Sequence, residues 1–121
     1  MKLNLESFLK YLNWKIKEAR GKDYTIGHAY FMKLDRVPQE KRTEAFVEVL
    51  KNAVLPLLQE YFYDDWEKLI EILNPKERAD VEKYLIDRFG EIKVRKENAR
   101  KIVKLLAKAV ELQEKGQNGQ I

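Results

Sequence analysis

Apolar side chains recur at three- and four-residue steps along most of this 121-residue chain, and this spacing limits the folds that it can adopt. The period matches one face of an α-helix, so each apolar stripe predicts an amphipathic helix with that face in a core. The sequence therefore predicts an all-α fold, a small bundle of about six helical segments. The longest stripes are Leu5, Phe8, Leu9, Leu12, Ile16 and Ala19; Ala45, Phe46, Val49, Leu50, Ala53 and Val54; and Ala99, Ile102, Val103, Leu106, Ala109 and Val110.

Residues with known preferences at helix ends place the first helices. Asn4 can cap the first helix, and Gly21 can end it in the left-handed conformation. Thr25 is the expected cap of a short second helix that reaches about Lys33. Pro38 suits the first turn of the next helix, because a proline there loses no backbone hydrogen bond.

Proline and capping residues also divide the middle of the chain. Pro56 interrupts an apolar stripe and must kink or divide that helix, since it has no N–H and crowds the preceding turn. Asp64 can cap the short helix that follows. Asn74 is the expected cap of the next helix, with Pro75 at its first position and Glu77 reaching back as in a capping box.

The last part of the chain contains one alternating stretch and one more helix. The helix that begins after Asn74 is expected to run to Phe89. Residues 91–95 then alternate like a β-strand but have no partner, which predicts an extended connector. The final helix is expected over 97–114, docked on the earlier helices. All segments form one domain, 1–115, followed by a disordered tail at 116–121.

The net charge of +4 is unevenly distributed. Residues 1–22 carry six basic and two acidic side chains, and residues 91–108 carry seven basic and two acidic ones, around an acidic middle. A basic chain makes nucleic acid a candidate partner. Simple solvation is the commoner origin of a lysine-rich face, so any such binding is expected to be weak. The candidate contacts to a phosphate backbone lie along one side of the last helix, at Arg100, Lys101, Lys104 and Lys108.

Composition also bounds the cellular setting. The chain has no cysteine, no apolar run of about 18 residues and no basic-then-apolar signal segment. We therefore expect a cytoplasmic protein that has no contact with a membrane. Charged residues make up 36% of the chain. Such charged surfaces, combined with the absence of cysteine, are typical of many heat-adapted proteins.

No arrangement of residues suits catalysis or metal binding. The pair Gly21-Lys22 is followed by Asp23 instead of the Ser or Thr of a phosphate-binding loop, and it ends a helix. A single histidine and no cysteine exclude the usual zinc sites. Glu60 and Asp64 could share a helix face as a weak cation site, although a capping role explains the presence of Asp64 more simply. The sequence thus predicts no catalytic residue, no metal ligand and no independent enzyme activity.

Two blocks of sequence combine aromatic residues with types that are uncommon elsewhere in the chain. They are Ile26-Gly27-His28-Ala29-Tyr30-Phe31 and Val54-Leu55-Pro56-Leu57-Leu58-Gln59-Glu60-Tyr61-Phe62-Tyr63-Asp64-Asp65-Trp66. With the helix before them, they resemble the C-terminal helical part of McrB-type AAA+ GTPases, the motor subunits of restriction systems that depend on modified cytosine. The order and spacing of the pieces agree, although Ala29 replaces the common serine. The resemblance covers residues 5–73, and residues 74–115 form a helical extension.

The resemblance implies a fold and a function. An AAA+ lid closes over nucleotide held by an α/β core, so the chain would be a non-catalytic lid that covers nucleotide on a separate core and contacts a neighbouring subunit. Gly27, His28 and Tyr30 would lie near the nucleotide, with the His28 imidazole reaching a phosphate. From the residues alone, a partly buried His28 bonded to backbone is the alternative. GTP-Mg²⁺ would bind only in the presence of the AAA+ core, and the isolated chain needs no cofactor.

Two other functions remain open from the residues themselves. The chain could be a standalone α-helical protein-interaction module, or a small basic nucleic-acid-binding protein. The aromatic residues bear on the first of these, because exposed aromatic side chains could form an interaction surface. Aromatic residues at helical spacing usually belong to the core, so we expect most of them to be buried. Tyr30 and Tyr63 are the expected exceptions.

Overall fold

The computed structural model describes residues 1–118 of the chain, and it confirms the predicted all-α fold. Within these residues there are six α-helices and no β-strand. The α-helices are α1 Leu5–Arg20, α2 Arg42–Val49, α3 Leu55–Tyr61, α4 Trp66–Leu73, α5 Arg78–Tyr84 and α6 Ala99–Asn118. The shorter segments are 3₁₀-helices at Lys22–Tyr24, His28–Arg36, Gln39–Lys41 and Lys96–Asn98, and a π-helix at Leu50–Val54.

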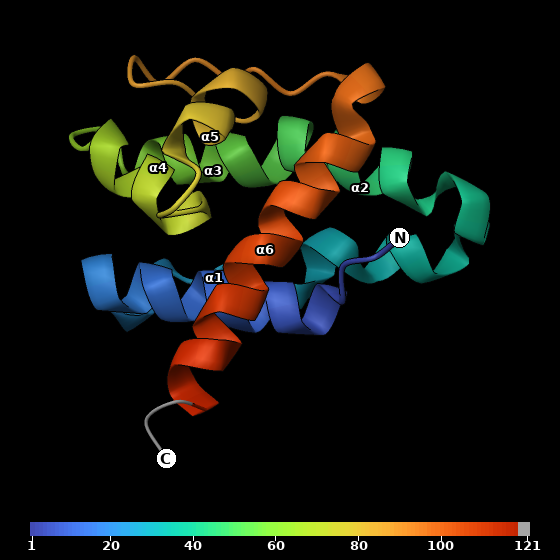
Figure 1. The fold of residues 1–121 in the computed structure, drawn as a ribbon, viewed down its shortest axis with the longest axis horizontal. Coiled ribbons are helices and arrows are strands. Elements are labelled where there is room, and N and C mark those ends of the chain that lie inside the picture. Colours follow the sequence, from blue (N-terminus) through green and yellow to red (C-terminus); the bar gives the residue numbers. More distant parts are fainter. Residues whose placement is uncertain (119–121) are drawn as a thin grey trace.

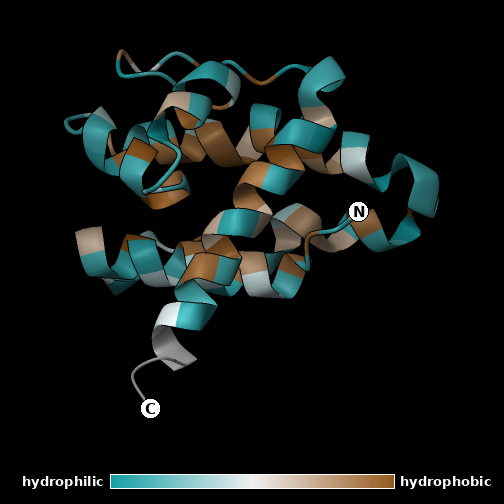
Figure 2. Ribbon diagram, viewed as in Figure 1, coloured by the Kyte–Doolittle hydropathy of each residue, from teal (hydrophilic) through white to brown (hydrophobic). Residues whose placement is uncertain are grey.

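The core lies between α1 on one side and the row formed by α2 and α3 on the other (Figure 1). α6 crosses this space and contacts both α1 and α2. At the other end of the molecule α4 packs on α1, and α5 packs on both α4 and α6. Figure 2 shows that the apolar residues concentrate on the inward-facing sides of these helices, while the outward-facing sides are hydrophilic.

A single hydrophobic core joins residues from both ends of the chain. Leu12, Phe46, Leu58 and Phe62 are fully buried, and Leu50 is nearly so, as their places in the apolar stripes predict. The docking of the last helix is confirmed as well. The buried residues of α6 are Ala99, Ile102, Val103, Leu105, Leu106, Ala109 and Val110.

Aromatic rings fill the part of the core near the start of α1. Phe31 stacks on Phe46 with ring centroids 5.6 Å apart, and Phe8 packs edge-on against both rings. Tyr30 and Tyr63 are exposed, with 38% and 73% of their surface accessible, which confirms the prediction that these two tyrosines lie outside the core.

The first helix begins where the sequence predicts. The Asn4 side chain accepts a hydrogen bond of 3.0 Å from the Ser7 N–H, which satisfies a free donor of the first turn. Gly21 ends the helix, but its angles of φ 99° and ψ 169° are not those of the left-handed helical region that was expected. The extended ψ sends the chain away from α1 toward the segment that follows.

Pro56 does not divide its helix. The backbone stays right-handed helical at Val49, Leu50, Val54 and Leu55, so α2 and α3 form one continuous row. The turn directly before Pro56 is widened into a π-helix, in which the Leu55 N–H donates to the Leu50 carbonyl. A π turn is a common way to fit a helix around a residue that cannot join its hydrogen-bond ladder.

Two predicted caps are wrong. Thr25 is extended, with φ −79° and ψ 165°, and the 3₁₀-helix begins at His28 without a side-chain cap. Asp64 does not cap α4, because its carboxylate pairs with Arg20. The cap is Asp65, whose carboxylate accepts a 3.0 Å hydrogen bond from the Lys68 N–H. The α-helix expected to begin near Pro38 also starts later, at Arg42, because the 3₁₀-helix Gln39–Lys41 precedes α2.

Asn74 has a different role from the predicted one. Helix α5 begins at Arg78, so Pro75 is not its first residue and the capping box with Glu77 does not form. The buried Asn74 amide instead donates 2.9 Å to the Leu105 carbonyl of α6. Its oxygen accepts from the backbone N–H groups of Lys76 and Glu77, at 3.0 and 3.1 Å. One side chain thus turns the chain and attaches it to α6.

Helix α5 ends at Tyr84 and does not continue to Phe89. The next residues form a narrow hairpin, in which the Lys93 N–H donates 2.8 Å to the Leu85 carbonyl and Ile86 bridges Ile92 in antiparallel fashion. The stretch 91–95 is therefore extended, as predicted, but it does have a partner. Phe89 at the tip is 82% exposed.

The C-terminal helix is longer than predicted. α6 runs from Ala99 to Asn118, so residues 116–118 of the expected disordered tail are helical. Residues 119–121 lie outside the described residues. Nowhere in residues 1–118 is a helix both long and apolar enough to cross a membrane.

Candidate functional site

The segment that carries the histidine is fixed to α1 by one side chain. The Asn13 amide donates 2.9 Å to the Ile26 carbonyl, and its oxygen accepts 2.6 Å from the Ile26 N–H. The Ile26 side chain is buried, so the segment is held by packing as well as by hydrogen bonds. These bonds explain why the helix does not start at Thr25. The N–H and the carbonyl of Ile26 are both bonded to Asn13, so the Ile26 carbonyl is not free to accept a helical hydrogen bond.

The three residues expected near nucleotide all lie on the surface. Gly27, His28 and Tyr30 are exposed, and they are brought together at the start of the 3₁₀-helix His28–Arg36. The alternative interpretation of His28, a partly buried imidazole bonded to backbone, is wrong, because the His28 side chain is exposed. The proximity of these residues to a nucleotide stays a prediction.

Gly27 has no internal reason to be glycine. Its φ is −77°, which any residue adopts, and a Cβ atom added to it would meet nothing within 4 Å. Apart from its two neighbours in the chain, nothing in the fold fills the space over Gly27. A residue without a side chain at this position allows another backbone or a ligand to approach closely.

Tyrosines border the segment on the side of α3. Tyr24 packs edge-on against Tyr61, with ring centroids 5.3 Å apart, and the Tyr61 hydroxyl donates 3.3 Å to the Thr25 carbonyl. Partial burial raises the pKa of Tyr61, and the neighbouring Tyr30, Glu60 and Tyr24 act in the same direction. Tyr24 and Tyr61 therefore form an aromatic border beside the exposed segment.

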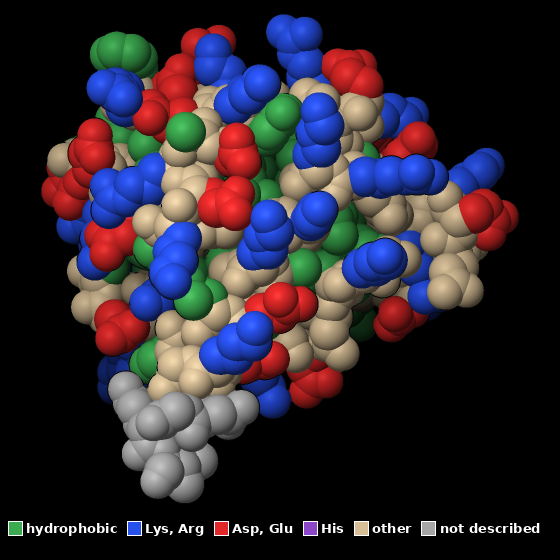
Figure 3. Space-filling view, in the orientation of Figure 1, with side chains coloured by type: hydrophobic (Ala, Val, Ile, Leu, Met, Phe, Trp, Pro, Cys, Tyr) green, Lys and Arg blue, Asp and Glu red, His purple; other side chains and the backbone are tan. Residues whose placement is uncertain are grey.

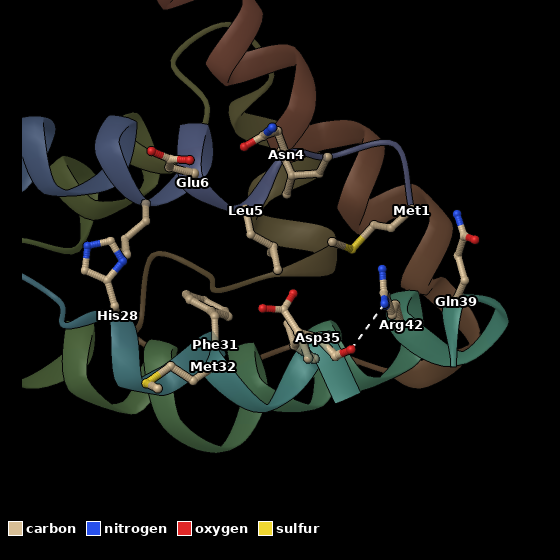
Figure 4. Close-up of a pocket in the computed structure, with 13 residues that line it drawn as sticks. Met1, Asn4, Leu5, Glu6, His28, Phe31, Met32, Asp35, Gln39 and Arg42 are labelled. Atoms are coloured by element: carbon tan, nitrogen blue, oxygen red, sulfur yellow. Dashed lines mark hydrogen bonds between the residues drawn. The ribbon is translucent and has the colours of Figure 1, made fainter. Parts of the chain in front are cut away.

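A groove of about 500 Å³ opens on the other side of the segment, between the start of α1 and the 3₁₀-helix (Figure 4). Leu5 and Phe31 line its apolar part. Figure 4 shows His28 at one end of the groove, below Glu6, and Asp35 and Arg42 toward the other end. The remaining lining residues are Met1, Leu3, Asn4, Leu9, Met32, Leu34 and Gln39.

Arg42 shapes the far end of this groove. Its guanidinium donates to the Val37 carbonyl at 3.0 Å and to the Asp35 carbonyl at 3.3 Å, which fixes the turn that ends the 3₁₀-helix. The Asp35 carboxylate is left at the rim. An apolar floor with a charged rim is the composition of a protein-contact surface.

The predicted phosphate contacts are confirmed as exposed, but they are not equivalent. Arg100, Lys101, Lys104 and Lys108 all face outward from α6. Lys108 pairs with Glu77 at 3.2 Å, and its hydrogen bond is the main cause that lowers the pKa of the Glu77 carboxyl. One of the four cations is thus partly neutralised by the protein itself. Contact with nucleic acid stays a prediction.

No group of three or more histidine, aspartate and glutamate side chains in residues 1–118 is arranged to hold a metal ion. Asp64, part of the weak acidic cluster seen in the sequence, is occupied by Arg20, whose guanidinium also lies 5.1 Å over the Phe62 ring. The acid therefore serves to join α1 to the end of α3.

Asn13 is the functional residue that sequence reasoning missed. It lies between the apolar residues Leu12 and Ile16 of the first stripe, inside a helix, where asparagine has a poor intrinsic propensity. That mismatch was the available signal, since a polar residue in such a place usually bonds to something specific. Its partner could not be read from the sequence.

Comparison with known proteins agrees with this geometry. The family model described as "McrB, alpha-helical lid domain" matches residues 4–70, from the cap of α1 into α4, and it includes the Asn13–Ile26 attachment and both aromatic blocks. No curated protein and no solved structure matches the chain. Because the matched region takes in more than half of the sequence, the chain belongs to the family of McrB α-helical lid domains.

Proposed function

We propose that this chain is the non-catalytic lid of a McrB-related AAA+ GTPase and closes over nucleotide held by a separate core. The family match to residues 4–70 carries the proposal. The exposed segment at Gly27 and His28 supports it, because it is attached to α1 through Asn13 and leaves open space over Gly27. A neutral or protonated imidazole in that position can donate a hydrogen bond to a phosphate oxygen.

We assign the contact with the core or with a neighbouring subunit to the groove beside His28. Its apolar floor and its rim of Glu6, Asp35 and Arg42 suit a protein surface. Nucleotide and protein contacts would then be adjacent, so closure over the nucleotide and contact with the neighbour would be coupled through one rigid segment. The chain would contribute no catalytic group or metal ligand of its own.

The test uses a McrB-type AAA+ GTPase core from which its own lid has been deleted. Adding this chain should raise the rate of GTP hydrolysis, and His28→Ala should reduce that rise about tenfold, equivalent to about 1.4 kcal/mol. Phe89→Ala is the matched control, because Phe89 is also exposed but lies on the hairpin outside the family match. Both variants should unfold like the wild type.

Binding of GTP to the chain alone provides the second measurement. Calorimetric titration of the isolated chain with GTP-Mg²⁺ should show no binding tighter than about 10 μM, which corresponds to about −7 kcal/mol. Tighter binding would show that the chain is not simply a lid. An equal loss of activity in His28→Ala and Phe89→Ala would remove His28 from the proposed role.

A further inference from the structure

A second surface feature lies in the extension, outside residues 4–70. It is an open hollow of about 310 Å³ between the end of α5, the strand-like stretch after the hairpin and the first turn of α6. Four cationic side chains line it, together with one tyrosine and one asparagine, and no carboxylate does. The lining residues are Lys83, Tyr84, Lys93, Arg95, Asn98 and Lys101.

The fold brings these cations together from three elements. In the extended stretch Val94 is buried, so the side chains on either side of it, Lys93 and Arg95, both face the hollow. Lys83 comes from the last turn of α5, and Lys101 from the first turn of α6. This grouping depends on the hairpin, which returns the chain beside α5. On the face shown in Figure 3, Lys and Arg side chains gather over the upper part of α6.

Tyr84 lies beside two of the cations. The Lys83 ammonium lies 5.3 Å from the centroid of the Tyr84 ring, and the Lys101 ammonium lies 5.5 Å from it. Each cation is attracted by the electron-rich face of the ring. The ring orients both cations at the hollow, where a phosphate oxygen could contact either ammonium group.

The protein itself does not neutralise this cluster. Among the described residues Lys83, Arg95 and Lys101 form no ion pair with an acid, whereas Lys93 pairs with Asp87 and Glu91. A neighbouring hollow between α5 and α6 shares Tyr84 and Lys101 with this one, but there Glu77 and Asp80 offset the charge of Lys104 and Lys108. The positive surface is therefore centred between α5 and α6, not along the α6 stripe.

We propose that the hollow formed by Lys83, Tyr84, Arg95 and Lys101 binds the phosphate backbone of nucleic acid. Exposed lysines hold a single small anion weakly, because water and salt screen each pair. A polyanion gains from several such contacts at once, since each neutralised phosphate releases condensed counterions. We expect the cations of this open hollow to contact phosphates, and phosphate contacts carry no sequence information, so binding should be independent of sequence.

The test compares two triple variants with the same change in net charge. Lys83→Gln, Arg95→Gln and Lys101→Gln remove the cations of the hollow. Lys17→Gln, Lys33→Gln and Arg36→Gln remove the same residue types from exposed positions on α1 and on the 3₁₀-helix beside it. Fluorescence anisotropy with a labelled oligonucleotide, single-stranded and duplex, is measured on the full chain from about 50 mM to about 200 mM salt.

The wild type should bind with a salt dependence of about −3 in log K against log salt for duplex DNA, corresponding to three phosphate contacts. The hollow variant should bind about tenfold or more weakly, and its slope should fall by about one for each cation removed. The control variant should stay within about twofold of the wild type, since only long-range charge has changed. Circular dichroism should show the same helix content for all three proteins.

Three results would overturn the proposal. The first is no binding by the wild type at about 50 mM salt. The second is an equal loss in both triple variants, which would reduce the effect to net charge. The third is displacement of the oligonucleotide by inorganic phosphate or GTP at matched ionic strength, because the hollow would then be a small-anion site.

Discussion

Single buried polar side chains fix the relation between elements that are distant in the sequence. The Tyr11 hydroxyl, on α1, donates 2.6 Å to the Ile72 carbonyl of α4. Asn13 attaches the histidine segment to α1, and Asn74 attaches the turn after α4 to α6. The bonds of Tyr11 and Asn74 are buried, and a polar group left there without a partner would cost about 1–3 kcal/mol, whereas the bonds of Asn13 are partly buried. The position of Gly27 and His28 on the surface depends on one such contact, that of Asn13.

The Tyr11→Phe variant should lower the free energy of unfolding by about 1–2 kcal/mol at neutral pH, because the Ile72 carbonyl loses its donor. The measurement is urea unfolding followed by circular dichroism. Tyr63→Phe is the control, since the Tyr63 side chain is exposed and should leave stability unchanged.

The same tyrosine predicts a dependence on alkaline pH. Burial, and to a lesser extent the charge of Glu71, raises the pKa of Tyr11 from 10.0 to about 12. A raised pKa means that folding favours the neutral phenol, so its contribution to stability is complete below pH 10.0 and is lost as the pH rises through about 12. The difference in stability between wild type and Tyr11→Phe should therefore shrink over that range. A constant difference would contradict the assignment.

At the scale of elements, helix α5 ends where a later part of the chain returns beside it. Helix α5 stops at Tyr84 because the next residues pair with the returning chain, with hydrogen bonds between Leu85 and Lys93 and between Asp87 and Glu91. Backbone N–H donors, from Glu91 first and then Phe89, lower the pKa of Asp87 and keep its carboxylate ionised in the turn. The turn is completed by Gly90, which lies against the Trp66 ring.

Gly90→Ala should lower the free energy of unfolding by about 2–4 kcal/mol, because two costs add. Its φ of +80° disfavours a side chain, and an added Cβ would lie 2.6 Å from two atoms of Trp66. Gly21→Ala shares only the positive φ and should cost about 1–2 kcal/mol. Thermal unfolding and tryptophan fluorescence are the measurements. Equal losses in the two variants would show that the contact with Trp66 contributes nothing.

At the scale of the molecule, the family match and the folding unit differ in extent. The match ends at residue 70, whereas the core continues through Val81, Leu85 and the buried face of α6. α6 lies between α1 and α2, so it covers apolar surface of the lid segment itself. The extension is therefore part of the structure that presents His28, although the hollow beside Tyr84 is separate from that segment.

A chain truncated after residue 73 should lose cooperative unfolding. Removal of α6 would expose the apolar faces of α1 and α2. Each aliphatic side chain that loses its burial costs about 1.5–3 kcal/mol, and the sum over several side chains exceeds the free energy of unfolding of a small domain. Phe89→Ala, a change at an exposed side chain, is the control and should leave the transition cooperative. Calorimetry and circular dichroism report both outcomes. A cooperative transition in the truncated chain would show that residues 1–73 fold independently.

The sequence by itself determined the helical class and the identity of most core residues. Burial of Leu12, Phe46, Leu50, Leu58 and Phe62 followed from three- and four-residue spacing, because a helix places such residues on one face whatever it packs against. The start of α1 followed from Asn4 in the same way, since a cap acts within one turn. The two aromatic blocks were likewise sufficient to indicate the lid family.

Only the tertiary structure decided the features that depend on contacts between distant segments. Thr25 is not a cap because Asn13 holds the next residue, and Asp65 replaces Asp64 as a cap because Asp64 pairs with Arg20. The exposure of His28 and the gathering of cations around Tyr84 arise in the same way. Such contacts join residues that are far apart in the sequence, so no periodic pattern reveals them. Local preferences differ little between neighbouring cap positions or helix boundaries, and the free energy of these distant contacts decides which one forms.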